Sequence, residues 1–189
     1  MENIDLNMGR IDVIIGCMFS GKSTEIIRQY KRYLSIGKNV LLINHKCDNR
    51  YGEGVVSSHD KMQLNCVSCS KLFNLIDEDV FINADIIMIE EAQFFKDLFN
   101  FVINAADVLN KVVIISGLDG DYKRKPFGDI LKLIPHAENV TKLKALCKIC
   151  NNGTPGCFTM RIVCNDNQLL VGGIDSYIPV CRSHYLENL

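Results

Sequence analysis

The chain has 189 residues and a formal net charge of −1 at pH 7, a length that suits one hydrophobic core, or one core with a small appendage. The near-neutral charge gives no general attraction to nucleic acid or to an anionic membrane, so neither is expected as a partner. The longest apolar runs, such as 86–89 and 112–115, are too short to span a bilayer. Because the acidic residues 1–5 lack the pattern of a signal peptide, we expect a cytoplasmic protein.

The stretch from residue 16 to residue 24 organises the rest of the chain. It reads Gly16-Cys17-Met18-Phe19-Ser20-Gly21-Lys22-Ser23-Thr24, which is the G-x-x-x-x-G-K-S pattern of a phosphate-binding P-loop. A strand-type run precedes it at 10–15, and helical apolar spacing follows it at 23–36. The glycines permit backbone conformations in which successive N–H groups point at phosphate oxygens. We therefore expect a nucleoside triphosphate site, with a purely structural glycine turn as the alternative.

The rest of the first 143 residues alternates between strand-type and helix-type segments. Strands are expected at 39–44, 85–91 and 112–117, helices at 70–76 and 98–109, and a loop at 55–64. Strand, helix and strand on this spacing predict right-handed parallel crossovers, which are typical of an α/β fold.

Two carboxylates, Glu90 and Glu91, end the strand expected at 85–91. In P-loop proteins, an acid at the tip of a strand beside the P-loop supports magnesium, while Lys22 reaches the phosphates and the Ser23 hydroxyl can be a metal ligand. A second carboxylate at that tip can act as a base. A pair of solvated acids is the alternative.

Two polar loops follow strand ends, which is where open α/β sheets bind ligands. The first contains Asp48, Asn49 and Arg50, for which a solvated loop is the default interpretation. The second, 118–128, contains the basic residues 123–125, which either are solvated or contact phosphate.

Nine cysteines, an odd number, argue against a disulfide framework and for reduced thiols. Cys147 and Cys150 form a C-x-x-C, and Cys181 and His184 form a C-x-x-H; strand-type runs at 158–164 and 168–174 lie between the two pairs. Two such pairs around a hairpin predict a zinc ribbon with a closed, structural Cys3His site. A further C-x-x-C at 66–69 has no second pair, so packing or exposure is favoured there over metal binding.

The order and spacing of these motifs closely resemble the cytosolic-type (type II) thymidine kinases from about Gly9 to His184. The matching segments are 16–24, 48–51, 90–95, 118–120, 124–128, the C-x-x-C, 171–173 and Tyr177 with the C-x-x-H. The resemblance implies an α/β P-loop (RecA-like) parallel sheet with helices on both faces in residues 1–143. It further implies a small C-terminal zinc-ribbon domain with a lasso loop in residues 144–189, with ATP, Mg2+ and structural Zn2+, a homotetramer, and dTTP as feedback inhibitor.

The resemblance also implies roles for individual residues. Glu91 matches the catalytic base and Glu90 the acid that supports magnesium with Ser23, while Arg50 and Lys22 stabilise the phosphoryl group in transfer. ATP is expected to contact residues 16–24, Asp48, Asn49, Arg50, Glu90 and Gln93. The lasso is roughly 151–159. Thymidine is expected to contact Met18, Phe94, Leu118, Tyr122, Phe127, Phe158, Thr159, Gln168, Leu169, Leu170, Val171, Gly172 and Tyr177, of which the apolar residues could instead be ordinary core.

The chain departs from the family pattern at three positions. The family usually has Asp-Glu-Gly-Gln where this chain has Glu90-Glu91-Ala92-Gln93, so the first acid is one methylene longer and an alanine replaces a glycine. Tyr122 stands where the family often has phenylalanine, and its hydroxyl needs a partner if it is buried. The departures at Glu90 and Ala92 bear on the metal geometry and remove neither carboxylate.

The expected reaction is transfer of the γ-phosphoryl of Mg-ATP to the 5′-hydroxyl of thymidine, with deoxyuridine tolerated, which gives dTMP and ADP for pyrimidine salvage. Two other functions stay open. One is a P-loop ATPase whose zinc ribbon binds nucleic acid, for which Lys142, Lys144 and Lys148 leave a small opening. The other is a GTP-dependent switch, which the lack of a clear guanine-reading N-K-x-D disfavours.

Overall fold

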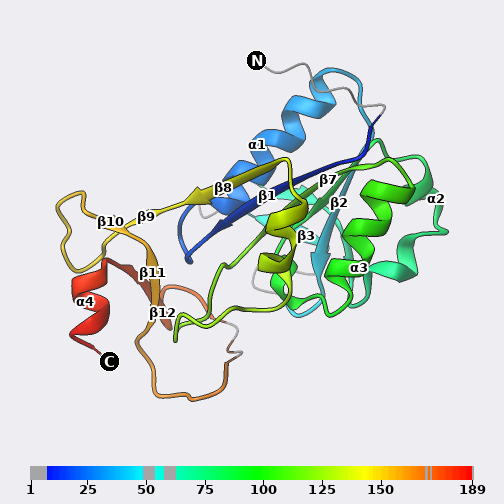
Figure 1. Cartoon of the computed structure of the whole chain (residues 1–189). Helices are drawn as coiled ribbons and strands as arrows, with labels where there is room; N and C mark the ends of the chain where they lie inside the picture. Colours follow the sequence, from blue (N-terminus) through cyan, green and yellow to red (C-terminus); the bar gives the residue numbers. More distant parts are fainter. Residues whose placement is uncertain (1–7, 49–53, 58–62, 169, 171, 189) are drawn as a thin grey trace.

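The computed structural model describes residues 8–48, 54–57, 63–168, 170 and 172–188. A six-stranded sheet with the order β5-β2-β6-β7-β1-β8 lies at its centre (Figure 1). Its strands are β1 (Arg10–Gly16), β2 (Val40–His45), β5 (Val67–Cys69), β6 (Ile86–Ile89), β7 (Val112–Gly117) and β8 (Asn139–Leu143). Neighbouring strands all pair in parallel, which confirms the predicted parallel α/β sheet.

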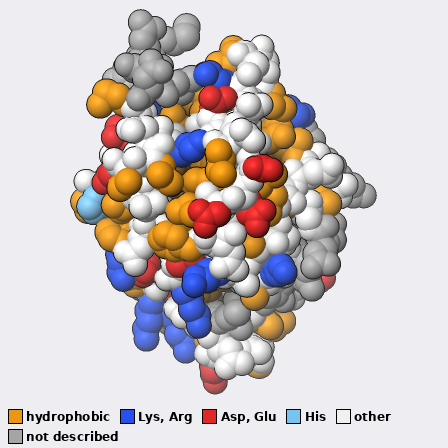
Figure 2. Space-filling view, turned by 90° about the vertical axis from the view of Figure 1, so that its right-hand side faces the viewer, with side chains coloured by type: hydrophobic (Ala, Val, Ile, Leu, Met, Phe, Trp, Pro, Cys, Tyr) orange, Lys and Arg blue, Asp and Glu red, His pale blue; other side chains and the backbone are white. Residues whose placement is uncertain are grey.

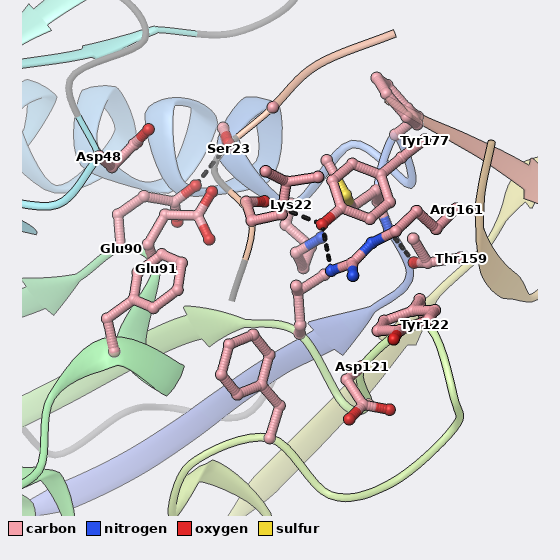
Figure 3. Close-up of a pocket in the computed structure, with 18 of the residues that line it drawn as sticks. Lys22, Ser23, Asp48, Glu90, Glu91, Asp121, Tyr122, Thr159, Arg161 and Tyr177 are labelled. Carbon is pink, nitrogen blue, oxygen red and sulfur yellow. Dashed lines mark hydrogen bonds between the residues drawn. The ribbon is translucent and has the colours of Figure 1, made fainter. Parts of the chain in front are cut away.

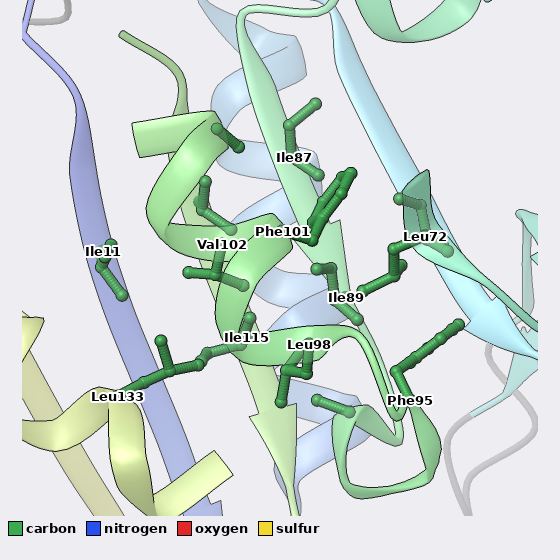
Figure 4. Close-up of a cluster of buried hydrophobic side chains, with 14 of the residues drawn as sticks. Ile11, Leu72, Ile87, Ile89, Phe95, Leu98, Phe101, Val102, Ile115 and Leu133 are labelled. Atoms are coloured by element: carbon green, nitrogen blue, oxygen red, sulfur yellow. The ribbon is translucent and has the colours of Figure 1, made fainter. Parts of the chain in front are cut away.

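Helices cover both faces of this sheet, as the sequence predicted. On one face, α1 (Lys22–Ser35) packs Ile26 and Ile27 against strand residues such as Met88 and Ile114. The opposite face holds the larger cluster, which the strands share with α3 (Leu98–Ile103) and several short helical segments (Figure 4). Because both faces are buried, β6 and residues 112–115 of β7 read as unbroken apolar runs and do not alternate with polar residues.

The remaining helical segments are short and belong mostly to this larger cluster. They are η1 (Leu72–Leu75), α2 (Asp79–Ile82), η2 (Ala92–Phe94), η3 (Asn104–Val108) and η4 (Ile130–His136). The single helix expected at 98–109 is divided, because α3 passes into a π-helical segment at η3. No helix in the described parts of the chain is both long and apolar enough to cross a membrane.

The sheet core supplies a test of the packing. Ile114 is fully buried in β7, so Ile114→Val should remove a methylene and lower the free energy of unfolding by about 0.5–1.5 kcal/mol. For a chain of this size, that corresponds to a fall in Tm of a few degrees, on the order of 2–4 °C per kcal/mol. The same substitution at Ile174, which is 70% exposed, is the matched control. Equal melting temperatures for the two variants would contradict the packing described here.

The prediction of a loop at 55–64 is wrong for the described residues of that range. Val55–Ser57 forms β3 and pairs antiparallel with β4 (Gln63–Asn65). Val56 is 2% exposed and joins the core cluster beneath α1. Two β-branched residues in succession favour a strand, and burial of one of them outweighs the weak local pattern.

The C-terminal part is built from short strands and one short helix. These are β9 (Ala145–Leu146), β10 (Pro155–Gly156), β11 (Phe158–Arg161), β12 (Tyr177–Val180) and α4 (Arg182–Leu186). The prediction of a hairpin between 158–164 and 168–174 is wrong, because β11 pairs antiparallel with β12. Val180 and Tyr177 can bury apolar surface, whereas 168–174 contains Gly172 and Gly173, which disfavour strand structure.

Candidate active site

A pocket lies between the P-loop end of the sheet and the C-terminal part, with about 1070 Å³ of empty volume that includes open solvent. Figure 3 shows side chains from both parts pointing into it. Predicted site residues that line it are Met18, Phe19, Gly21, Lys22, Ser23, Thr24, Asp48, Glu90, Glu91, Phe94, Leu118, Tyr122, Phe127, Thr159, Gln168, Leu170, Gly172 and Tyr177. The structure therefore brings most of the predicted ATP and thymidine residues to one cavity.

The P-loop connects β1 to α1 and takes the geometry that its glycines allow. A Cβ at Gly16 would lie 2.5 Å from the Leu143 carbonyl oxygen, and Gly21 has φ +87°, a left-handed conformation that L-residues avoid. Three predicted ATP-contact residues of the loop do not line the pocket: Gly16, Cys17 and Ser20. The Lys22 ammonium, which is largely buried, donates to the Cys17 carbonyl oxygen at 2.8 Å.

Glu90 follows β6 and lies against the first turn of α1. The Ser23 hydroxyl donates to Glu90 Oε1 at 2.5 Å, and Glu90 Oε2 is buried without a hydrogen-bond partner among the described residues. Burial raises the pKa of the Glu90 carboxyl to about 7, and the neighbouring charge of Glu91 adds to the rise. A buried carboxylate oxygen without a partner, beside a hydroxyl, fits the oxygen ligands that Mg2+ takes.

Glu91 faces the pocket from a strained backbone position, with φ 50° and ψ 40°. Such left-handed conformations cost a non-glycine residue about 1–3 kcal/mol and cluster at active sites. Gln93 Nε2 donates to Glu91 Oε2 at 2.5 Å, and Gln93 Oε1 accepts from the Leu118 backbone N–H at 3.0 Å. Gln93 itself does not line the pocket, and its amide joins the Glu91 carboxylate to the backbone at Leu118. Ala92, the departure from glycine, begins η2 without a positive φ.

Aromatic side chains supply part of the pocket lining, among them Phe94, Tyr122, Phe127 and Tyr177. The rings of Phe94 and Phe127 meet edge to face, with centroids 5.6 Å apart. Tyr177 donates its hydroxyl hydrogen to the Leu170 carbonyl oxygen at 2.8 Å, and the Tyr122 hydroxyl donates to the Asp166 carbonyl oxygen at 3.2 Å. The hydroxyl that distinguishes Tyr122 from the family's phenylalanine therefore has a partner.

Several predicted site residues are not brought to the pocket or are not described. Phe158 packs in the core of the C-terminal part, with its ring 5.6 Å from that of Tyr185. Within the lasso expected at 151–159, only Thr159 lines the pocket, where its hydroxyl accepts from the Met18 backbone N–H at 3.0 Å. The other lining residues of that part are Arg161 at the end of β11, Tyr177 at the start of β12, and Gln168, Leu170 and Gly172 between the two strands. The predicted sites Asn49, Arg50, Leu169 and Val171 lie outside the described residues.

Sequence reasoning missed four residues that line the pocket: Val56, Gly120, Asp121 and Arg161. Asp121 is an acid in the charged loop 118–128, yet it is only 7% exposed. Its Oδ1 accepts from the backbone N–H groups of Lys123 and Lys125, a local turn that the sequence could have suggested. Arg161 carried no sequence signal, because its partners depend on the pairing of β11 with β12.

The four predicted zinc ligands come together at the C-terminal end of the molecule. His184 Nδ1 lies 3.3, 3.4 and 3.6 Å from the sulfur atoms of Cys181, Cys150 and Cys147, and the Cys150 and Cys181 sulfurs are 3.8 Å apart. A tetrahedral Cys3His zinc with bonds of about 2.0–2.3 Å spaces its ligand atoms by about 3.5–3.8 Å. The cluster therefore fits a closed zinc site.

The other C-x-x-C does not resemble this cluster. Cys69 is buried in the larger core cluster, and Cys66 packs against the cluster beneath α1. Burial raises the pKa of the Cys66 thiol to about 11, which disfavours the thiolate that a metal needs. The packing interpretation of this pair is confirmed.

Comparison with known proteins agrees with this arrangement. A family model described as thymidine kinase matches residues 9–185. Thymidine kinase a of Arabidopsis thaliana is 43% identical over 95% of this chain and 76% of its own length, and the thymidine kinase of Sheeppox virus is 42% identical over 95% of this chain and 98% of its own length. Thymidine kinase 1 of Dictyostelium discoideum is 43% identical over 94% of this chain. The chain belongs to the thymidine kinase family.

Proposed function

We propose that the protein transfers the γ-phosphoryl of ATP to the 5′-hydroxyl of thymidine, tolerates deoxyuridine, and releases dTMP and ADP for DNA precursor synthesis. One observation supports this most strongly: the P-loop, the carboxylate pair and an aromatic-lined end share a single pocket, in a chain of the thymidine kinase family. The P-loop suits the triphosphate, and the aromatic end suits a base and its sugar.

The chemistry asks mainly for alignment and charge neutralisation. Lys22 and the P-loop N–H groups hold the phosphates, and Glu91 accepts the proton of the 5′-hydroxyl. Asp48 also lines the pocket and is proposed to contact ATP. Ser23 and Glu90 would hold Mg2+, which neutralises negative charge on the phosphate oxygens when it is bound. Arg50, outside the described residues, stays a proposal as the stabiliser of the transferred group.

Base selection is proposed to depend on backbone groups of the chain between β11 and β12. Thymine presents an acceptor, an N–H donor and an acceptor along one edge, which a backbone can complement. Cytosine mismatches this pattern and leaves a buried group unpaired, at a cost of about 1–3 kcal/mol. The thymine methyl needs only a shallow apolar pocket, so its loss costs less.

A radiochemical or coupled assay with ATP and each nucleoside tests the proposal. Thymidine should give a monophosphate, deoxyuridine should follow within about tenfold in kcat/KM, and deoxycytidine should be lower by about 5–150-fold, the equivalent of 1–3 kcal/mol. Omission of Mg2+ should abolish the product. ATP hydrolysis that nucleic acid stimulates and thymidine does not affect, without any dTMP, would contradict the kinase and support the ATPase alternative.

The formal net charge of −1 gives that alternative little support. On the face seen in Figure 2, lysine and arginine side chains gather toward the lower left, and the others are scattered and do not form a continuous band. The electrostatic footprint of a nucleic-acid-binding protein is usually a basic patch or stripe. We retain thymidine phosphorylation as the single proposed function.

Four further proposals accompany this function. Residues 1–143 and 144–189 are proposed as a nucleotide-binding domain and a zinc-binding domain, with a structural zinc ion at Cys147, Cys150, Cys181 and His184. A homotetramer and feedback inhibition by dTTP rest on the family resemblance alone, and a cytoplasmic location stays a proposal. Size-exclusion chromatography with light scattering, and inhibition assays with dTTP, address the oligomer and the inhibitor.

A further inference from the structure

Arg161 ends β11 and points its guanidinium into the space between Tyr122 and Tyr177 (Figure 3). Its Cζ lies 3.7 Å from the centroid of the Tyr122 ring and 5.2 Å from that of Tyr177. Both distances are within the range of a cation–π contact. The side chain therefore joins a loop of the nucleotide-binding part to a strand of the C-terminal part.

The same guanidinium holds the chain that crosses the pocket after β11. Nη1 donates to the carbonyl oxygens of Asn165 and Asn167, both at 2.6 Å. Nη2 donates to the Gln168 carbonyl oxygen at 3.1 Å and to the Tyr177 hydroxyl at 2.8 Å. Three backbone carbonyls of one short segment thus converge on a single side chain.

A further hydrogen bond joins the same segment to the loop 118–128. Gln168 Nε2 donates to Asp121 Oδ2 at 2.8 Å, where Asp121 is itself buried. The Tyr177 hydroxyl, which accepts from Arg161, donates in turn to the Leu170 carbonyl oxygen. Because Gln168 and Leu170 line the pocket, this network fixes the residues that a bound nucleoside would meet.

These contacts argue against a role for Arg161 in binding phosphate. A guanidinium has four terminal N–H groups, and here four hydrogen bonds engage its two terminal nitrogens. Its Nε is buried and has no partner among the residues that the structure describes. No terminal donor is left for a phosphoryl oxygen, so the effect of Arg161 must pass through the segment it holds.

We propose that Arg161 is a positioning residue that sets the affinity for the nucleoside by holding Asn165, Asn167 and Gln168 across the pocket, and that it does not take part in phosphoryl transfer. The inference rests on the proposed thymidine kinase activity. It assigns nucleoside affinity to the contacts of Arg161 with this segment and with Tyr122 and Tyr177.

Steady-state kinetics of Arg161→Ala and Arg161→Lys test this inference. Arg161→Ala should raise KM for thymidine by about 10–100-fold, because three carbonyls lose their donor, while KM for ATP and kcat stay within about threefold. Arg161→Lys keeps the charge but loses the planar fork, so its KM should lie between those of the wild type and the alanine variant. Tyr177→Phe combined with Arg161→Ala should raise KM by less than the product of the single effects, because both act through one network.

Arg182→Ala is the matched control, since this exposed arginine also lies over an aromatic ring, that of Phe158 at 4.9 Å, but outside the pocket. It should leave KM for thymidine unchanged. An unchanged KM for thymidine in Arg161→Ala would overturn the inference. So would Arg161→Lys if its KM for thymidine and its KM for ATP rose by the same factor as its kcat fell. A wild-type protein that makes no dTMP would instead overturn the proposed function, so the two failures are distinguishable.

Discussion

Glu91→Gln is expected to lower kcat for thymidine phosphorylation by a factor of about 10²–10⁴ and to change KM for ATP little. A positioned base contributes a rate factor of this size, and glutamine keeps the shape of the side chain but cannot accept the proton. The P-loop residues that would hold the triphosphate, Lys22 among them, are untouched, so ATP binding should persist. Loss of kcat without loss of binding is the signature of a group that acts in the transition state.

Steady-state kinetics with each substrate varied, together with a melting curve, give the measurement. The melting curve matters because Glu91 has a left-handed backbone and a bond from Gln93, so the substitution could alter the local fold. Glu78→Gln, at an exposed site, is the matched control and should keep full activity. A kcat for Glu91→Gln within about threefold of the wild type would show that another group accepts the proton.

The central fold and the zinc ligands were predictable because their signals are local. The P-loop pattern fits within nine residues, and strand runs such as 112–115 are apolar throughout because the sheet is covered on both faces. The two ligand pairs, 147–150 and 181–184, each need only a tight turn to aim at one ion. Such features depend little on the rest of the chain.

The missed features depend on residues far apart in the sequence. The stretch 162–176 gives no sign that β11 pairs with β12 across it, and only that pairing places Arg161 between Tyr122 and Tyr177. The side chain of Gln93 turns to Glu91 and Leu118, contacts that the residue pattern did not indicate. Side-chain direction at such positions follows from tertiary packing, which a pattern of residue types does not contain.

Removal of zinc is expected to unfold the C-terminal part and, with it, to abolish thymidine phosphorylation. The core there is small: its buried members are Cys147, Val180 and Tyr185, too few to hold a unit of this size without a metal or another staple. Structural zinc contributes about 10–16 kcal/mol to the folding of zinc-finger peptides. Cys147→Ser should therefore lower the bound zinc from one ion per chain and expose residues 144–189 to protease, leaving a resistant fragment that ends near residue 143.

The loss of activity follows from contacts that the zinc-binding part makes with the rest of the site. Thr159 accepts from the Met18 backbone N–H, and the Tyr185 hydroxyl donates to the Tyr122 carbonyl oxygen at 2.7 Å. Without the metal, we expect both contacts to be lost, and the lining residues of the C-terminal part to leave the pocket. Metal analysis, limited proteolysis and activity before and after treatment with a zinc chelator give the measurement, and Cys164→Ser, at an exposed cysteine, should match the wild type. A wild-type protein that contains no zinc, or a Cys147→Ser variant that keeps both its zinc and its protease resistance, would contradict the structural role of the site.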